Sequence, residues 1–440
     1  MMTSTCARTL TISAVAAVAA VAAVALFPLA ANAAPLRIAT WNLGWHVSQA
    51  ELAGWTAQCG KFFVKNASSG VWEVAAADAP GAMTGWSISE SRAKLEGVDL
   101  SVQPPCGVYQ DPARKGIAVT AVVYAKRNSQ IARLLANEVK PDVIALQEVS
   151  GTQAVKEVLG AAAGDYNVCS FDGQYKVPRL AFAWRKSLGA AVEPCADIEP
   201  MALPSLSSDA QVRPGYKVTL RLNGKAVRFL TVHLKSGCVS PLDRGKLDQN
   251  AGADDPCLIL QQQVAPLEEE FEQLAKGVDH FVVLGDFNRN LWHEANRVKS
   301  AEAVRSDGST DLTKPRNGKV LTRNLLLEVN DGAPTESTAV LLAPTCGGDA
   351  AVAAACESSK IGLLDAAQRK VLTAKTGLGC RNPVGLDHII VSQSLAGAVR
   401  STMKVSIGVM GVSLSSKPPG LPDPVLSVSD HCPLVAEIEL

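Results

Sequence analysis

Short apolar runs that end in polar side chains recur along this chain, and the clearest is residues 281–284. Its four consecutive apolar residues, three of them β-branched or aromatic, predict a short strand buried on both faces. Asp286 and Asn288 follow Gly285 and end the run. Because they are two positions apart, they point to the same side while the backbone stays extended, and they can act on one ligand, metal ion or water.

The same arrangement occurs at several other places. Residues 36–40, 143–146 and 227–232 are apolar runs with a polar residue at their exit, whereas residues 389–391 and 434–436 follow one. If the last two strands run antiparallel to the others, all of these polar groups meet at one edge of the sheets. The polar residues at the strand ends are Asn42, Glu148, His233, Asp286, Asn288, Asp387, Asp430 and His431.

Helical periodicity separates these strands. Apolar residues at helical spacing predict helices at 131–139, 153–163 and 258–275. Asn223-Gly224 between two apolar runs predicts a tight hairpin. Strands that alternate with helices, together with this hairpin, predict a mixed α/β fold in which sheets pack on each other and helices cover them outside.

Two segments are longer than a connection between strands requires. Residues 50–115 carry Cys59 and Cys106 near their ends, and residues 310–383 carry three further cysteines and a short helix predicted around 362–374. No internal repeat or linker rich in Gly and Ser divides the chain. We therefore expect one domain over residues 34–440 with two insertions.

The first residues have the pattern of a signal peptide. A lone positive charge, Arg8, precedes an Ala/Val/Leu run that continues to Leu29, and Ala31-Asn32-Ala33 supplies the small residues of a cleavage site. We predict a signal over residues 1–33 and export to the periplasm or the extracellular space. The alternative is an uncleaved anchor, because the apolar run is long enough to cross a bilayer.

Cysteine usage agrees with export. Of the eleven cysteines, ten follow the predicted signal, and this even number is compatible with disulfides in an oxidising compartment. Proximity in sequence suggests the pairs Cys59–Cys106, Cys169–Cys195 and Cys238–Cys257. The other four cysteines are left open, and Cys432 is either a disulfide partner or a buried free thiol.

Overall charge gives no general affinity for nucleic acid. Lys and Arg number 42, as do Asp and Glu, so the chain has no overall basic field. A small site can still bind one phosphate group through a metal ion.

The polar strand ends, taken in order, resemble the motifs of the endonuclease/exonuclease/phosphatase superfamily, which includes deoxyribonuclease I, apurinic endonucleases, neutral sphingomyelinases and inositol phosphatases. Each motif alone is weak, but in this order they are specific. The resemblance implies a four-layer αββα sandwich of two mixed, mainly antiparallel sheets with outer helices, and a site at one end of both sheets. The matching motifs are Trp41-Asn42, Gln147-Glu148, His233, Gly285-Asp286-Phe287-Asn288, Leu386-Asp387-His388 and Ser429-Asp430-His431.

These residue types suit the hydrolysis of a phosphoester with help from a hard divalent cation. The reaction needs positive or hydrogen-bonding groups on the phosphoryl oxygens and a group that orients water. Carboxylates and carboxamides without a cysteine pair favour Mg²⁺ or Mn²⁺, with Ca²⁺ also possible. Glu148 is the first choice as metal ligand, with Asn42 beside it and Asp430 as a further ligand.

The resemblance leaves the proton transfers open. His431, with Asp387 accepting its other ring proton, either acts as general base on water or stays protonated at the phosphate. In the second case Asp286 activates the water. Asn288 would orient water or bind the phosphate beside Asp286.

The resemblance also implies further contacts to the phosphate. His233 would meet a non-bridging or leaving oxygen as a protonated imidazole, as in the deoxyribonuclease and sphingomyelinase branches. Lys235 and Arg289 could add positive charge, although both could equally be solvated loop cations.

We expect an exported, monomeric, metal-dependent phosphodiesterase without stable membrane insertion, and most of all a nuclease acting on DNA or RNA. A sphingomyelinase-type lipid phosphodiesterase or a phosphomonoesterase is the alternative, and the apolar residues 405–414 keep a membrane-active enzyme open. A non-catalytic surface binding protein is a third reading. The complete acid and histidine set speaks against it, because a decayed site would have lost some members.

Overall fold

The computed structural model describes residue 1 and residues 35–88, 93–98, 104–107, 119–171, 179–207, 211–242, 255–299, 325–411 and 426–440. The chain divides into two compact units, Met1–Ala34 and Pro35–Leu440, and the helices and strands that the structure describes belong to the second. Apart from Met1, the predicted signal lies outside the described residues. Among the helices that the structure describes, none has the length and apolar character to span a bilayer.

Two central sheets are built mainly from antiparallel strands. One has the order β14 (Thr345–Cys346), β16 (Val399–Lys404), β17 (Leu434–Ile438), β1 (Leu36–His46), β6 (Val143–Val149), β8 (Arg179–Arg185) and β7 (Tyr166–Ser170). The other has the order β13 (Ala339–Leu341), β15 (Asp387–Ser392), β12 (His280–Asp286), β11 (Lys225–His233), β10 (Gly215–Leu222) and β9 (Glu193–Ile198). The parallel pairs are β14–β16, β1–β6 and β11–β12.

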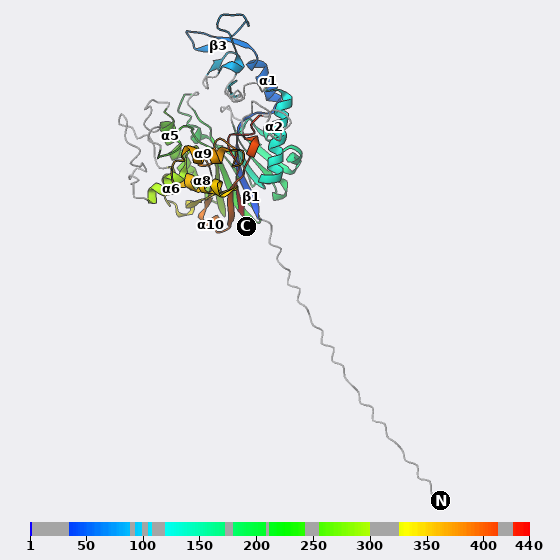
Figure 1. Cartoon of the computed structure of the whole chain (residues 1–440). Helices are drawn as coiled ribbons and strands as arrows, with labels where there is room; N and C mark the ends of the chain where they lie inside the picture. The colour runs from blue at the N-terminus through cyan, green and yellow to red at the C-terminus, as the bar shows by residue number, and fades with distance from the viewer. Residues whose placement is uncertain are drawn as a thin grey trace. The chain divides into compact units, whose positions relative to one another are not determined.

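The sheets pack face to face, with helices outside. Ile38 and Phe182 of the first sheet and Phe229 and Val282 of the second belong to one buried apolar cluster between the sheets. In Figure 1, α2 and α5 lie on opposite sides of the strands. This confirms the predicted four-layer sandwich. The helices on the first sheet are α2 (Ala121–Leu134), α3 (Thr152–Leu159), α8 (Ala350–Ile361) and α9 (Ala366–Thr373), and those on the second are α5 (Pro256–Leu274), α6 (Leu291–Lys299) and α7 (Leu325–Val329).

Shorter elements complete the described fold. The helix α10 (Gln393–Ala396) follows β15, and a π-helix over Leu135–Val139 extends α2. Short 3-10 helices lie at Gly85–Ser87, Gly160–Asp165, Lys186–Leu188, Glu199–Ala202, Thr335–Ser337 and Gly408–Met410.

Strand direction brings the polar strand ends together. β1 and β6 are parallel, as are β11 and β12, so the residues at their exits lie at one end of the sandwich. β15 runs antiparallel to β12 with Asp286 opposite Asp387, and β17 runs antiparallel to β1. Gly285 allows β12 to lie close to β11, because a Cβ there would lie 2.1 Å from the Val232 carbonyl oxygen. The predicted antiparallel relation of the last strands is therefore confirmed.

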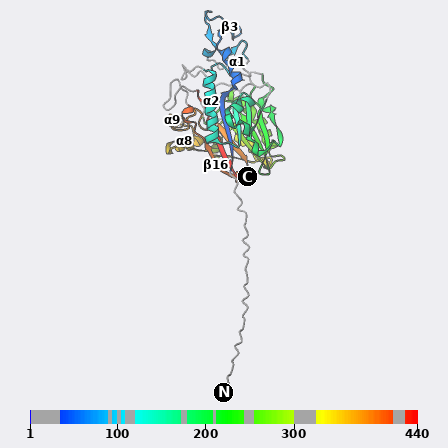
Figure 2. The ribbon, with the colours of Figure 1, turned by 90° about the vertical axis from the view of Figure 1, so that its right-hand side faces the viewer.

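The first long segment holds structure that the sequence pattern did not reveal. It contains α1 (Gln49–Cys59) and a small sheet of β4 (Met83–Thr84), β2 (Phe62–Lys65), β3 (Val71–Ala75) and β5 (Lys94–Leu95). Its apolar core surrounds Trp55 and reaches Tyr124 of α2. Both views show α1 and β3 at the same end of this unit (Figures 1 and 2).

The second long segment is also more ordered than its sequence indicated. The short helix predicted around 362–374 is α9, but α8 and the edge strands β13 and β14 gave no periodic signal. α8 is rich in alanine, so small apolar side chains occur all around it and no polar face stands out. Edge strands of two or three residues are too short to show alternation.

Five disulfides connect the described residues. The three pairs expected from proximity, Cys59–Cys106, Cys169–Cys195 and Cys238–Cys257, are present. The remaining cysteines form Cys346–Cys356 and Cys380–Cys432, so Cys432 is not a free thiol. This density of disulfides is typical of a secreted protein or of one in an oxidising compartment.

Candidate active site

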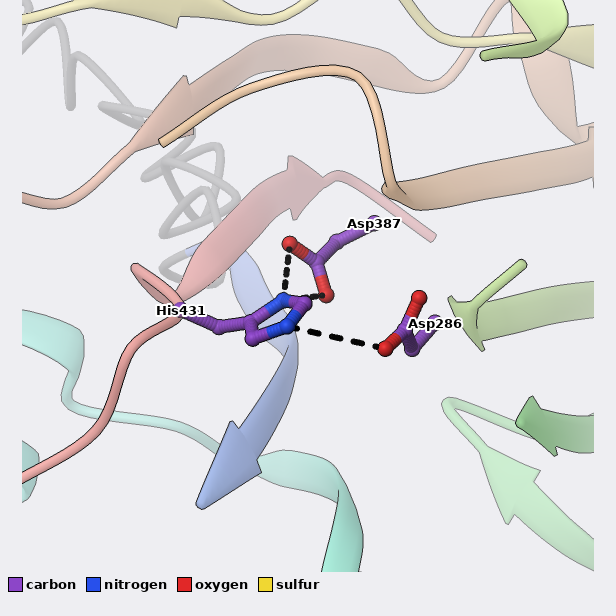
Figure 3. Close-up of side chains that lie close together, drawn as sticks. All are labelled: Asp286, Asp387 and His431. Carbon is purple, nitrogen blue, oxygen red and sulfur yellow. Dashed lines mark hydrogen bonds and ion pairs between the residues drawn. The ribbon is translucent and has the colours of Figure 1, made fainter. Parts of the chain in front are cut away.

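A histidine lies between two buried carboxylates at the end of the sandwich (Figure 3). His431 Nδ1 is 3.1 Å from Oδ1 and 3.2 Å from Oδ2 of Asp387, and its Nε2 is 3.7 Å from Asp286 Oδ2. Asp286 ends β12, Asp387 begins β15, and His431 precedes β17. Three segments that are distant in sequence therefore meet at one imidazole ring.

A buried lysine completes this cluster. Lys404 Nζ of β16 donates to Asp387 Oδ2 at 2.7 Å and to the Cys432 carbonyl at 3.1 Å. Burial alone would raise the pKa of Asp387, but Lys404 and His431 outweigh burial and hold that pKa well below its usual range. Burial lowers the pKa of His431, yet the two aspartates prevail and raise it to about 10. The cluster thus favours an ionised Asp387 and a cationic His431 at neutral pH.

Replacing Lys404 with methionine is expected to cost roughly 3 kcal/mol or more of unfolding free energy at pH 7, because Asp387 loses a buried partner. The folded-state pKa of Asp387 lies below its unfolded value of about 3.9, so its stabilisation is present above that pH and is lost on further acidification. Urea unfolding at pH 7 and pH 3 should show a difference between variant and wild type that shrinks at low pH. Lys225→Met, at the exposed ion pair with Asp279, is the control and should cost below about 1 kcal/mol.

Asn42 and Glu148 lie where a β-bulge shifts the pairing of β1 with β6, at the same end of the sandwich as His431. Asn42 Nδ2 donates to Asp286 Oδ2 at 2.9 Å, and its Oδ1 accepts from the backbone of Gly44 at 2.9 Å. Glu148 Oε2 accepts from the backbone of Trp45 at 2.8 Å. Gly44, Trp45 and Glu148 all have a positive φ, which is rare for residues with a side chain and is often found at functional sites.

The half-buried carboxylate of Glu148 fits a cation site. Burial raises its pKa, and the nearby charge of Asp430 raises it further, while Arg213 partly offsets both. A bound divalent cation would stabilise the ionised Glu148 carboxylate and offset its repulsion with Asp430. Asn42, Glu148 and Asp430 offer only oxygen ligands, which Mg²⁺, Mn²⁺ and Ca²⁺ prefer.

The cluster around His431 offers a second set of metal-ligating atoms among the described residues. One ligand atom each from Asp286, Asp387 and His431 lies within 4.8 Å of the others. The ammonium of Lys404 and the Nδ1 of His431 already occupy the Asp387 carboxylate, however. A metal ion at Asp387 would have to compete with that lysine. Asp286 lies beside both sets of ligands and could contribute to either.

Asn288 supports the carboxylate of Asp286. Its backbone N–H donates to Asp286 Oδ1 at 2.8 Å, and its Nδ2 donates to the Leu234 carbonyl at 3.0 Å. Its φ is 51°, so the chain turns sharply here. Asn288 therefore lies beside Asp286, as expected, but its amide nitrogen is already bonded to the backbone.

His233 lies within the cluster, close to two of its carboxylates. Its Nε2 is 3.6 Å from Glu148 Oε1 and 3.6 Å from Asp286 Oδ2. Burial, with the positive charge of Arg213, lowers the pKa of His233 well below its usual value. These surroundings favour the neutral imidazole, and the contact of a protonated His233 with a phosphate oxygen stays a prediction.

The two cations expected near the phosphate have different surroundings. Lys235 is half-buried and close enough for its charge to lower the pKa of His233. Arg289 instead is buried, with Nε 2.6 Å from Glu294 Oε1 and a terminal nitrogen 3.0 Å from the Cys238 carbonyl. These contacts give Arg289 a structural role, in place of the phosphate contact that its position after Asn288 indicated.

Sequence reasoning missed several charged and polar residues of the site. Lys404 lies on a strand that no motif marks, and Arg213 precedes β10 in an irregular segment. The charge of Arg213 influences Glu148 and Asp286, so it lies near both carboxylates. Asn382 belongs to the second insertion and contacts His431. None of these residues has a local signal, because each is defined only by partners distant in sequence.

An αββα sandwich with acidic and histidine side chains at one end of its central sheets is the arrangement expected of a phosphoesterase. A family model described as the Endonuclease/Exonuclease/phosphatase family matches residues 124–431. The chain therefore belongs to this family, whose members are hydrolytic phosphoesterases.

Several solved structures also match the chain, at low identity and with TM-scores below 0.5. A mannosyl-6-phosphatase of Bacteroides thetaiotaomicron is 13% identical, with 92% of this chain and 100% of that chain covered and a TM-score of 0.41. A 3'-5' exonuclease from Neisseria meningitidis is 21% identical, with coverage of 71% and 95% and a TM-score of 0.35. D. rerio TDP2 complexed with single strand DNA product is 14% identical, with coverage of 74% and 96% and a TM-score of 0.39. No curated protein matches the chain.

Proposed function

We propose that this chain is an exported, divalent-metal-dependent phosphodiesterase that hydrolyses DNA or RNA. The observation that carries the proposal is the position of His431 between Asp286 and Asp387, at the end of the sandwich where Glu148 also lies. An anionic phosphodiester needs positive charge on its phosphoryl oxygens and a base for the attacking water. This cluster offers both.

The charge states favour one of the two assignments of acid and base. A His431 with its pKa raised to about 10 holds its proton at neutral pH and is suited to stabilise a phosphoryl oxygen. Burial, with Asp387 nearby, raises the pKa of Asp286 to about 7, although His431 and Asn42 act in the opposite direction. A base with a pKa near the working pH is effective in proton transfer. We therefore assign water activation to Asp286 and charge stabilisation to His431.

The oxygen ligands of Asn42, Glu148 and Asp430 would hold Mg²⁺ or Mn²⁺, with Ca²⁺ as a further candidate. When bound, such a cation supplies charge neutralisation at the phosphoryl oxygens. We prefer this set to Asp286, Asp387 and His431, because Lys404 already neutralises Asp387. Asn42 would connect the two sets through its hydrogen bond to Asp286.

The surroundings favour a nucleic acid over a lipid. Arg213, Lys235 and Arg381 place positive charge beside the acidic and histidine residues, and these cations can contact phosphates that flank the scissile one. The apolar stretch that left a membrane-active enzyme open begins with Val405 and Ile407. Both are buried in the core, with 8% and 1% exposure, so these two side chains do not form a surface for insertion into a bilayer, while residues 412–414 of the stretch lie outside the described residues.

An activity panel tests the proposal. Double-stranded DNA, single-stranded DNA, RNA, sphingomyelin, inositol phosphates and bis-p-nitrophenyl phosphate should be offered with Mg²⁺, Mn²⁺ or Ca²⁺, with and without chelator. We expect hydrolysis of nucleic acid and of the synthetic diester, loss of turnover on chelation and recovery on adding metal back. Hydrolysis of sphingomyelin alone would support the lipid alternative. Failure to hydrolyse any of the diesters with every metal would refute the proposal.

A further inference from the structure

We propose that Asn382, which the second insertion brings into the site, is a positioning residue that holds the Asp430 carboxylate and the His431 imidazole in a fixed relation. The inference rests on the proposed function. It concerns a residue outside the strand-end motifs, on a segment that precedes Asp387 in the chain.

The backbone of Asn382 is docked directly on the segment that carries His431. Its N–H donates to the Asp430 carbonyl at 2.7 Å, and Asn382 and His431 form an isolated parallel bridge. The disulfide Cys380–Cys432, with a Cα–Cα distance of 5.6 Å, ties the same two segments together. A covalent bond and a backbone hydrogen bond therefore fix where the Asn382 side chain begins.

The side chain of Asn382 contacts both functional groups through one atom. Nδ2 lies 3.0 Å from Asp430 Oδ2 and 3.3 Å from His431 Nε2. The opposite amide orientation would place Oδ1 against the carboxylate of Asp430, oxygen to oxygen, so Nδ2 is the atom that belongs there. An amide nitrogen carries two hydrogens, and one of them is directed at Asp430.

This contact determines which oxygen Asp430 presents to the site. Oδ2 accepts from Asn382 and from Arg381, each at 3.0 Å. Oδ1 is turned toward Gly44, where a Cβ would lie only 3.1 Å away. The Arg381 side chain is 74% exposed and is a weak anchor, whereas the half-buried Asn382 gives the carboxylate a defined orientation.

The same contact limits the rotation of the His431 ring. Asp387 holds the ring at Nδ1, and Asn382 Nδ2 packs against Nε2 at 3.3 Å. The cationic ring carries a proton on Nε2, so this second contact is steric and not a hydrogen bond. Nε2 is also the atom that faces Asp286. Loss of Asn382 would free Asp430 and remove one of the two restraints on the ring, so metal binding and turnover should weaken together.

Asn382→Ala tests this inference, with metal binding measured apart from activity. We expect Mn²⁺ affinity in titration calorimetry to fall about 10-fold and kcat on bis-p-nitrophenyl phosphate to fall about 10- to 100-fold, since partners that orient metal ligands have effects of this size. KM should change little, because Asn382 acts through Asp430 and His431. Asn382→Asp keeps the shape but sets one carboxylate against another, so it should be at least as impaired.

A matched control separates positioning from general loss of packing. Asn330 is another half-buried asparagine, with hydrogen bonds of 3.0 and 2.8 Å to the backbone of Ala339, so Asn330→Ala should leave kcat and Mn²⁺ affinity unchanged. Wild-type values in Asn382→Ala, or full activity in Asn382→Asp, would overturn the inference while the proposed function stands. A wild type that neither binds Mn²⁺ nor hydrolyses the diester would overturn both.

Discussion

Replacing His431 with glutamine is expected to lower kcat on the order of 10³-fold with a small change in KM. Glutamine can still donate a hydrogen bond, but it cannot carry the positive charge that Asp387 and Asp286 maintain on the imidazole by raising its pKa to about 10. The charge matters most where the phosphoryl oxygens become more negative, in the transition state. Steady-state rates on bis-p-nitrophenyl phosphate and on DNA, at saturating metal, give the comparison.

The fold should survive this change, since glutamine can still hydrogen-bond to Asp387. Near-ultraviolet circular dichroism and the thermal midpoint check that point. His280→Gln is the matched control: its Nδ1 is 2.9 Å from the Ser394 hydroxyl at the opposite end of β12, and its loss should leave kcat unchanged. Wild-type kcat in the His431 variant would remove this residue from the mechanism.

Replacing Asp286 with asparagine should have the second large effect, a fall in kcat of about 10³- to 10⁴-fold. Asparagine has the same shape and can still accept the hydrogen bond from the Asn288 backbone. It cannot accept a proton from water, and it cannot balance the charge of His431, which lies 3.7 Å away. Single-turnover rates separate this loss of chemistry from a change in substrate binding.

The same variant gives a test of stability without metal. The folded-state pKa of Asp286, about 7, lies above its unfolded value of about 3.9. Between these two pKa values the folded state therefore binds more protons than the unfolded state. The contribution of Asp286 to the free energy of unfolding of the wild type thus falls as the pH rises through this window. Urea unfolding in chelator at pH 4 and pH 8 should show Asp286→Asn gaining stability relative to wild type at the higher pH.

Asp279→Asn is the control for both measurements, because Asp279 precedes the other end of β12 and is partly exposed, where it accepts from the Ala226 backbone at 2.7 Å. Its kcat should equal that of the wild type. An Asp286→Asn enzyme that turns over normally, with an unaltered pH response of stability, would contradict both assignments.

The sequence contained enough information to predict the framework of the site. Asn42, Glu148, His233 and Asp286 each follow a mainly apolar run in or at the end of a strand, and a polar residue in such a place needs a partner when the strand is buried. Strand direction then brings these ends together. The order of the motifs therefore predicted which family the chain belongs to and which layers it would form.

What the sequence could not predict are interactions that depend on three-dimensional partners. Lys404 lies in a segment that carries no motif, yet it is almost fully buried against Asp387. Arg289 follows the strongest motif, yet its partner is Glu294. The small sheet of the first insertion escaped detection because its strands have two to five residues and lack a long alternating pattern.

The bond between Cys380 and Cys432 has a consequence for when the enzyme becomes competent. It closes next to His431, and without it the segment that carries Asn382 is held to its neighbour only by noncovalent contacts. A newly made chain in a reducing compartment lacks that tether and should be a poor catalyst. Under the proposed export and nuclease function, oxidation after translocation would complete the enzyme away from the nucleic acids of the cell that made it.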